Sequence, residues 1–192
     1  MSRGTLGTLA ILALAAVLIA LTLAEVDHAV RDRGLPLSDT AVIREQAAAK
    51  HLDPALIAAV IYAETKFDPR PSSAGAQGLM QILPETAYYL AHLSGGTQFT
   101  ASDLASPRVN VAYGSYYLRY LLDHYDGNEV LALAAYNGGL ANVDRWVAEA
   151  DSAGRRLTIE EIPFPETREY VRRVLDAEQL YRSDYARELG IA

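Results

Sequence analysis

Residues 64–87 read ETKFDPRPSSAGAQGLMQILPETA. Pro, Ser and Gly crowd the part from Phe67 to Gln77, and this composition predicts a loop. Pro84 then predicts the start of a short helix. Neither part alternates apolar and polar residues as a half-buried strand does. The stretch is therefore expected to join two helices through a long loop, a place where functional groups are often found.

The residues before this loop form an apolar helical pattern that ends near Glu64. Asp53-Pro54 predicts the start of the helix, with a capping carboxylate followed by Pro at the first helical position. Ile57, Val60 and Ile61 share the face on which Glu64 lies. Burial at the end of such a face raises the pKa of a carboxyl group and keeps it protonated near neutral pH. A solvated glutamate without a chemical role is the alternative, and the periodicity alone slightly favours it.

Helical patterns continue through most of the remaining chain. No strand pattern of useful length is present, and 51% of the residues are hydrophobic, which suits one domain with a substantial core. The sequence therefore predicts an all-α fold. We expect helices over residues 41–50, 54–65, 84–93, 107–125, 128–136, 140–150 and 166–188, with a turn at Gly154 and a few extended residues before Phe164.

The N-terminus carries an unbroken apolar run from Thr5 to Ala24. About 20 such residues are enough to cross a bilayer as a helix. The run is either a signal peptide or an uncleaved membrane anchor, and its length favours the anchor because signal h-regions have about 7–15 residues. Both interpretations place the rest of the chain outside the cytoplasm, membrane-anchored or secreted. We therefore expect the segment at 1–24, a polar linker over 25–38 and a monomeric catalytic domain over 39–192.

The composition excludes several kinds of site. The chain has a formal net charge of −7 and no basic run, so nucleic-acid binding is not expected. It has no cysteine, which excludes disulfides, thiolate metal ligands and cysteine nucleophiles. No metal-binding or phosphate-binding motif is present, and we predict no metal and no cofactor. The histidines are scattered along the chain, at His28, His51, His92 and His124.

Four blocks of sequence together resemble one known family. The first is Glu64 to Ala87, with its GAQGLMQ and PETA segments. It is followed in order by NVAYGSYYLRYL at 110–121, AAYNGG at 134–139 and IPFPETREYV at 162–171. These blocks resemble the soluble lytic transglycosylases, relatives of goose-type lysozyme. The resemblance implies a lysozyme-like helical domain that acts on the glycan strands of peptidoglycan.

The resemblance also implies roles for seven residues. Glu64 matches the family's single catalytic acid/base. The other six match substrate-binding positions. Ser73 matches a hydroxyl near that carboxylate, and Met80 and Gln81 match two residues that line the sugar-binding cleft. Tyr136 and Asn137 match a Tyr-Asn pair whose Tyr lies beside the glutamate, and Glu166 matches a residue that holds the peptide stem.

Physical arguments support some of these roles and offer alternatives to others. Met80 presents a soft, adaptable surface to a sugar, although composition alone favours core filling. The Gln81 amide can both donate to and accept from an N-acetyl group. Tyr136 is equally well explained as a core tyrosine at a helix end.

The implied reaction cleaves the β-1,4 bond between N-acetylmuramic acid and N-acetylglucosamine and leaves a 1,6-anhydro end. Ordinary glycosidases use two carboxylates. Asp68, Glu85 and Asp103 are candidates for a second one, yet each has a ready structural role in a loop or at a helix start. A single acid/base therefore fits better. The alternatives are a muramidase that hydrolyses the same bond and, less favoured, a non-catalytic glycan-binding protein of the cell envelope.

Overall fold

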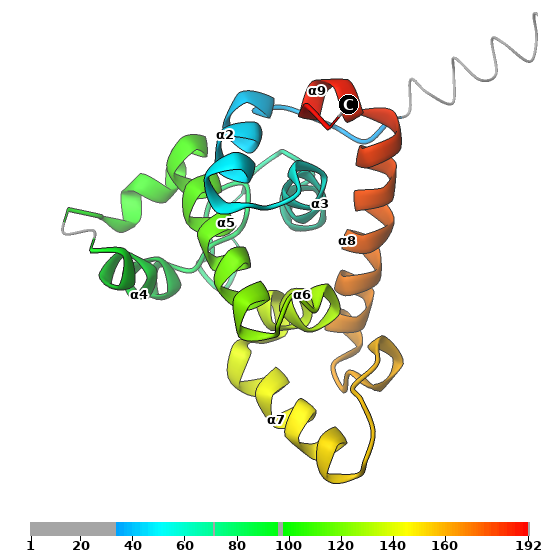
Figure 1. Cartoon of the computed structure of the whole chain (residues 1–192). Helices are drawn as coiled ribbons and strands as arrows, with labels where there is room; N and C mark the ends of the chain where they lie inside the picture. Colours follow the sequence, from blue (N-terminus) through cyan, green and yellow to red (C-terminus); the bar gives the residue numbers. More distant parts are fainter. Residues whose placement is uncertain (1–33, 71, 96–97, 192) are drawn as a thin grey trace, which may run out of the picture. The chain divides into compact units, whose positions relative to one another are not determined.

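The structure is a computed structural model that describes residues 34–70, 72–95 and 98–191. Leu35–Ala192 forms one compact unit, and its regular elements in the described residues are helices (Figure 1). The single pairing of strand type among them is an isolated bridge between Gln77 and Ile82, so the all-α prediction is confirmed. The helices are α2 (Thr40–Lys50), α3 (Pro54–Thr65), α4 (Pro84–Ser94), α5 (Pro107–His124), α6 (Glu129–Gly138), α7 (Leu140–Ser152), α8 (Pro165–Asp184) and α9 (Ala186–Leu189), with short 3-10 helices η1 (Ala101–Ala105) and η2 (Ile159–Glu161).

Helix α3 lies at the centre of the core. Every residue from Ala55 to Ile61 is buried, so the helix is apolar on all sides, as a fully enclosed helix requires. Its start follows the sequence prediction: the Asp53 side chain accepts a hydrogen bond of 2.7 Å from the Ala55 N–H, and Pro54 occupies the first turn. The long helix α8 packs against α3, and these two helices are in more extensive contact than any other pair of elements in the described residues. Glu64 therefore emerges from a rigid element.

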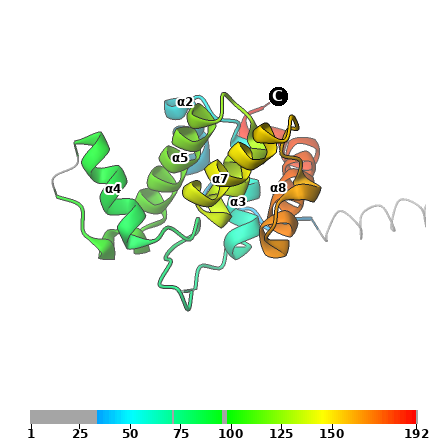
Figure 2. The ribbon, with the colours of Figure 1, turned by 90° about the horizontal axis from the view of Figure 1, so that it is seen from below.

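Three helices hold the loop between α3 and α4 at one dipeptide, Leu79–Met80. From α3, the Thr65 hydroxyl donates to the Leu79 carbonyl at 2.8 Å. From α5, Asn110 Oδ1 accepts from the Met80 N–H at 2.8 Å. From α6, the Tyr136 hydroxyl donates to the Met80 carbonyl at 2.9 Å. Figure 2 shows this loop running from the end of α3 to α4. Side chains rather than regular backbone pairing thus fix its position.

Two glycines let the loop approach α5 closely. Gly78 has φ +73°, and a Cβ built there would lie 2.1 Å from Asn110 Nδ2. Gly114 on α5 faces the fully buried Met80, whose Sδ would lie 2.4 Å from a Cβ at that position. Any larger residue at either position would push the loop away from α5.

Several element boundaries differ from the sequence expectation. The last helix breaks at Tyr185, which separates α8 from α9. The residues before Phe164 form η2 rather than an extended segment, and η1 was not expected. The η1 turn is set by a capping box in which Asp103 accepts from the Thr100 N–H at 2.8 Å. Local side-chain bonds of this kind carry no hydrophobic period, so pattern analysis misses them.

Part of the expected linker packs on the helical unit. Tyr185 and Tyr181 donate hydrogen bonds of 2.5 Å to the carbonyls of Leu35 and Pro36. The predicted signal peptide or anchor at 1–24 falls outside the described residues. None of the helices in the part of the chain that the structure describes is both long and apolar enough to cross a membrane.

The buried Asn110 amide yields a stability prediction. Its Nδ2 donates to the carbonyls of Gln77 (2.8 Å) and Leu104 (3.1 Å), in addition to the bond from Met80. Asn110→Ala leaves these buried groups without partners and is expected to lower the free energy of unfolding by about 3 kcal/mol. Urea denaturation measures this loss. Gln179→Ala, on the exposed face of α8, is the control and is expected to change the free energy by less than about 0.5 kcal/mol.

Candidate active site

Glu64 lies in the last turn of α3, largely buried where the helix meets the loop. Burial raises the pKa of its carboxyl group from 4.5 to about 7, while the Tyr170 hydroxyl and then the Arg173 guanidinium act in the opposite direction. The carboxyl group therefore remains substantially protonated at neutral pH. A carboxylic acid in this state can donate a proton to a leaving group.

Two tyrosines, the buried Tyr170 and the partly buried Tyr136, lie near Glu64. The charge of Glu64 contributes to the raised pKa of both Tyr136 and Tyr170, after the larger effect of burial. Both therefore stay protonated and can act as neutral donors. Tyr136 already donates to the Met80 carbonyl, whereas the Tyr170 hydroxyl has no hydrogen-bond partner among the described residues. Tyr170 interacts with Glu64 without reaching full hydrogen-bond geometry, and such bonds often shorten when a substrate binds.

Glu64 opens onto a pocket of about 400 Å³. One second carboxylate, Asp68, lies among the lining residues. It is largely exposed and forms an ion pair of 2.7 Å with Arg70, so it points to solvent and not into a buried site. The complete lining is Ala63, Glu64, Thr65, Lys66, Asp68, Arg70 and Arg173.

The other two carboxylates considered from sequence lie elsewhere. Asp103 caps η1, as described above. Glu85 lies exposed in the first turn of α4, and neither residue lines the Glu64 pocket. Within the described ranges no cluster of His, Cys, Asp and Glu suited to a metal ion is found.

The predicted substrate-binding residues occupy different kinds of position. The Met80 side chain is fully buried in the core, and its peptide group is what contacts Tyr136. Gln81 adopts a left-handed backbone conformation with φ +48°, which is strained for a residue other than Gly. Its amide donates to the carbonyls of Arg70 and Gly78, which leaves its Oε1 available as an acceptor.

Ser73 lies exposed in the loop and is not among the residues that line the Glu64 pocket. A hydrogen bond connects Asn137 with the residue that follows Glu166. The Thr167 hydroxyl donates to Asn137 Oδ1 at 2.8 Å, which joins the end of α6 to the first turn of α8, where Glu166 is exposed. The roles of Ser73, Asn137 and Glu166 in binding substrate stay predictions.

The sequence reasoning missed Tyr170, Arg173 and Asn110 as site residues. Tyr170 and Asn110 stand inside two of the blocks quoted above, in the segments ETREYV and NVAYG, so a signal was present. Nothing in the helical spacing of α8 shows that Tyr170 and Arg173 face Glu64, because that contact joins residues about a hundred positions apart. Only tertiary packing brings them together.

One known protein family matches more than half of the chain. The model of the transglycosylase SLT domain family matches residues 41–159, which include Glu64 and the first three sequence blocks. The chain belongs to this family. The fourth block, which holds Tyr170, lies beyond the matched residues.

Individual relatives in the family support the same conclusion. The chain is 32% identical over 152 residues to a soluble lytic murein transglycosylase from Escherichia coli, an alignment that covers 77% of this chain and 23% of that protein. Among solved structures, it is similar to an inactive glutamate-to-glutamine variant of lytic transglycosylase Slt from Pseudomonas aeruginosa, with a TM-score of 0.70, 33% identity and coverage of 79% of this chain and 25% of that one. The 70 kDa soluble lytic transglycosylase from Escherichia coli gives a TM-score of 0.71, with 31% identity and coverage of 77% and 24%. The chain therefore has the helical, lysozyme-like SLT fold and spans about a quarter of the length of these relatives.

The raised pKa of Glu64 predicts how stability depends on pH. Because the folded pKa lies above the ordinary value of 4.5, folding favours the protonated form, and this stability is lost as the pH rises through about 7. Glu64→Gln lacks this loss. We therefore compare the free energy of unfolding of Glu64→Gln with that of the wild type at each pH. This difference should be larger at pH 8 than at pH 4, in favour of the variant, by up to about 3 kcal/mol.

Urea denaturation at the two pH values measures this difference. Glu85→Gln, at an exposed position on α4, is the matched control and is expected to follow the wild type. If the free energies of unfolding of Glu64→Gln and of the wild type differ by the same amount at pH 4 and at pH 8, the burial of a protonated Glu64 is contradicted.

Proposed function

We propose that this chain is a peptidoglycan lytic transglycosylase with Glu64 as its single acid/base. The observation that carries the proposal is the largely buried Glu64 carboxyl, protonated near neutral pH and flanked by Tyr136 and Tyr170. Membership of the SLT family supports it. So do the relatives, which are named as lytic murein transglycosylases, one of them inactive after a glutamate-to-glutamine change.

In the first step, protonated Glu64 donates its proton to the glycosidic oxygen that leaves C1 of N-acetylmuramic acid. The bond between C1 and this oxygen breaks, and N-acetylglucosamine leaves with a new hydroxyl. The acetamido group of the muramyl ring stabilises the positive charge at C1. A neutral acid is well suited to this transfer, because it can give its proton directly to the leaving oxygen.

In the second step, the Glu64 carboxylate accepts the proton of the muramyl C6 hydroxyl. The C6 oxygen bonds to C1, which closes the 1,6-anhydro ring and returns Glu64 to its protonated state. The neutral hydroxyl of Tyr170, which has no partner among the described residues, is positioned to donate to the carboxylate formed between the two steps. No water enters the reaction.

A muramidase that hydrolyses the same bond is the second candidate. A two-carboxylate hydrolase requires a second acid that faces the substrate. In the Glu64 pocket this would be Asp68, which is exposed and paired with Arg70. This pairing favours the single-acid mechanism over hydrolysis.

We also propose that the catalytic unit works outside the cytoplasm as a monomer, anchored through residues 1–24. Peptidoglycan lies outside the cytoplasm, and an apolar segment of this length is suited to the membrane. The relatives include a membrane-bound lytic murein transglycosylase C from Actinobacillus pleuropneumoniae, 27% identical over 162 residues.

Mass analysis of digested peptidoglycan tests the reaction. The wild type should release muropeptides with anhydromuramyl ends, which are one water lighter than hydrolysed ends. Glu64→Gln should lower the rate of release by at least about a hundredfold, because the amide cannot donate an acidic proton. Asp68→Asn is the matched substitution in the same pocket. This variant should still release muropeptides with anhydromuramyl ends.

Reducing muramyl ends alone from the wild-type digest would contradict the transglycosylase. Loss of activity in Asp68→Asn comparable to that in Glu64→Gln would favour the two-carboxylate hydrolase.

The pH dependence of kcat/KM gives an independent prediction. Because the protonated form of Glu64 starts the reaction, kcat/KM should fall above about pH 7. Tyr170→Phe removes an interaction that lowers the Glu64 pKa. In this variant the fall in kcat/KM should therefore begin at a higher pH than in the wild type. The measurement is the rate of muropeptide release from pH 4 to pH 9. If the fall in kcat/KM begins at a lower pH in Tyr170→Phe than in the wild type, the interaction between Tyr170 and Glu64 is contradicted.

A further inference from the structure

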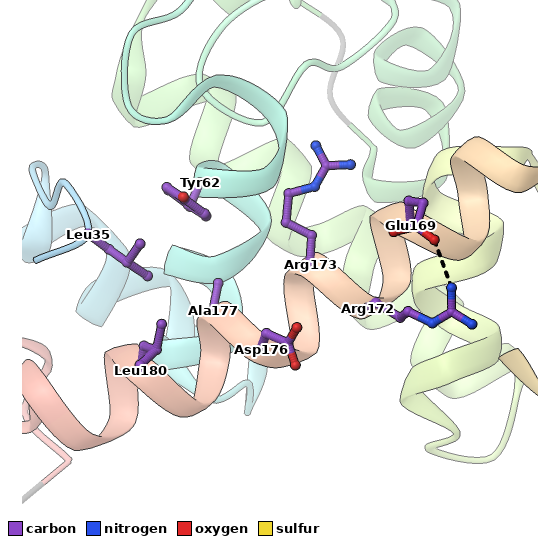
Figure 3. A pocket seen from close by; sticks show the side chains of 8 residues that line it. All are labelled: Leu35, Tyr62, Glu169, Arg172, Arg173, Asp176, Ala177 and Leu180. Carbon is purple, nitrogen blue, oxygen red and sulfur yellow. Dashed lines mark hydrogen bonds and ion pairs between the residues drawn. The ribbon is translucent and has the colours of Figure 1, made fainter.

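Arg173 on α8 lines two cavities that meet at its side chain. One is the Glu64 pocket, and the other is a cavity of about 490 Å³ along α8, whose walls include Tyr62 and Asp176 (Figure 3). Tyr170 lies three residues earlier, on the same face of α8, and also interacts with Glu64. Figure 3 shows the Arg173 side chain extending from α8 beside α3, away from Asp176. Because Arg173 is exposed and Glu64 is largely buried, the guanidinium lies on the solvent side of the Glu64 pocket.

Arg173 forms no ion pair among the described residues. Its neighbour Arg172 does: it bonds to Glu169 at 2.7 Å, as the dashed line in Figure 3 shows, and lies 3.6 Å from Glu160. Arg173 has no carboxyl group within 4.0 Å in the part of the chain that the structure describes, and this includes the carboxyl group of Glu64. An exposed side chain changes rotamer within nanoseconds, so the guanidinium can move toward a charge that appears nearby.

The charge of Glu64 changes during the proposed reaction. Burial keeps its carboxyl group protonated near neutral pH by raising its pKa, and a neutral acid offers no charge to a guanidinium. Once the proton has moved to the glycosidic oxygen, a carboxylate remains in a largely buried position, where a charge without a partner is costly. The Tyr170 hydroxyl is a neutral donor and supplies no compensating charge. The carboxylate therefore needs a cation at this stage of the reaction.

Three cationic side chains of the described residues line the Glu64 pocket, and they differ in what they can offer. Arg70 is paired with Asp68 at 2.7 Å. Lys66 is exposed at the end of α3, and neither Lys66 nor Arg70 is among the groups that shift the pKa of Glu64. The charge of Arg173 does lower this pKa, after the larger effects of burial and of a tyrosine hydroxyl. Arg173 is therefore the cation best placed to meet the carboxylate.

We propose that Arg173 is a positioning residue that binds the Glu64 carboxylate formed in the first step and releases it in the second. In the first step, Glu64 gives its proton to the glycosidic oxygen, and the guanidinium of Arg173 moves onto the carboxylate that remains. In the second step, the carboxylate takes the proton of the muramyl C6 hydroxyl, and the ion pair opens again. Arg173 touches none of the reacting atoms and acts through Glu64. This inference rests on the proposed function.

The ion pair affects the chemical steps more than it affects substrate binding. By stabilising the carboxylate, Arg173 makes Glu64 a stronger acid in the first step. In the free enzyme and in the substrate complex Glu64 is still neutral, so the pair contributes little before the first step begins. Loss of the Arg173 charge should therefore lower kcat and leave KM nearly unchanged.

The release of anhydromuramyl ends by the full-length protein, followed across the pH range, tests this role. In Arg173→Gln, kcat at about pH 5.5 should fall about threefold, the effect expected of one solvent-screened charge. The fall in kcat/KM should begin at a higher pH than in the wild type, because an interaction that lowers the Glu64 pKa is lost. Arg173→Lys keeps the charge and should recover most of kcat together with the pH dependence of the wild type.

Arg187→Gln is the matched control. Arg187 is exposed on α9, lines neither cavity and is not among the groups that shift the Glu64 pKa. This variant should keep the kcat and KM of the wild type. The other titratable groups that face Glu64 or its pocket stay the same in all three variants: Tyr136 from α6, Tyr170 from α8, and Lys66, Asp68 and Arg70 from the loop.

An unchanged kcat and an unchanged pH dependence in Arg173→Gln overturn the role of Arg173 and leave the reaction standing. A rise in KM at unchanged kcat does the same, because Arg173 would then bind the substrate and not Glu64. An equal fall of kcat in Arg173→Gln and Arg173→Lys, with the pH dependence of the wild type, reveals a structural role and also overturns the proposal. If the wild type releases no anhydromuramyl ends, the proposed function fails, and the role of Arg173 fails with it.

Discussion

The arrangement around Glu64 depends on one dipeptide, Leu79–Met80, to which side chains of α3, α5 and α6 all bind. Its carbonyl and N–H groups are bonded by Thr65, Asn110 and Tyr136, so side chains from three helices hold the loop in place. Thr65 follows Glu64 directly, and Tyr136 faces it. The same bonds that fix the loop therefore also fix the acid and its neighbour.

The environment of Glu64 balances opposing effects on one carboxyl group. Burial favours the protonated form, whereas Tyr170 and Arg173 favour the charged form. A much more buried acid would hold its proton too tightly to donate it, and a solvated one would lose it at neutral pH. The resulting pKa near 7 suits the proposed role of Glu64 as an acid in the first step and a base in the second.

The sequence predicted the helices well because their signals are local. The Asp53-Pro54 start and the apolar face of α3 are set by neighbouring residues, and both were confirmed. Periodicity left the role of Glu64 open, and the resemblance of the four ordered blocks favoured the acid/base. Composition favoured the burial of Met80, which the structure shows. The contact of Tyr170 with Glu64 and the packing of Met80 against Gly114 were not predictable, because they join residues far apart in the chain. The bounds of η1 and η2 were missed because capping bonds, not apolar periods, set them.

The central claim is that folding keeps the Glu64 carboxyl group protonated near neutral pH. Titration of this carboxyl by carbon-13 NMR, with labelled glutamate and Glu64→Gln used to assign its signal, tests the claim directly. The account predicts a midpoint at about pH 7. A midpoint close to 4.5, the ordinary value for glutamate, would contradict it.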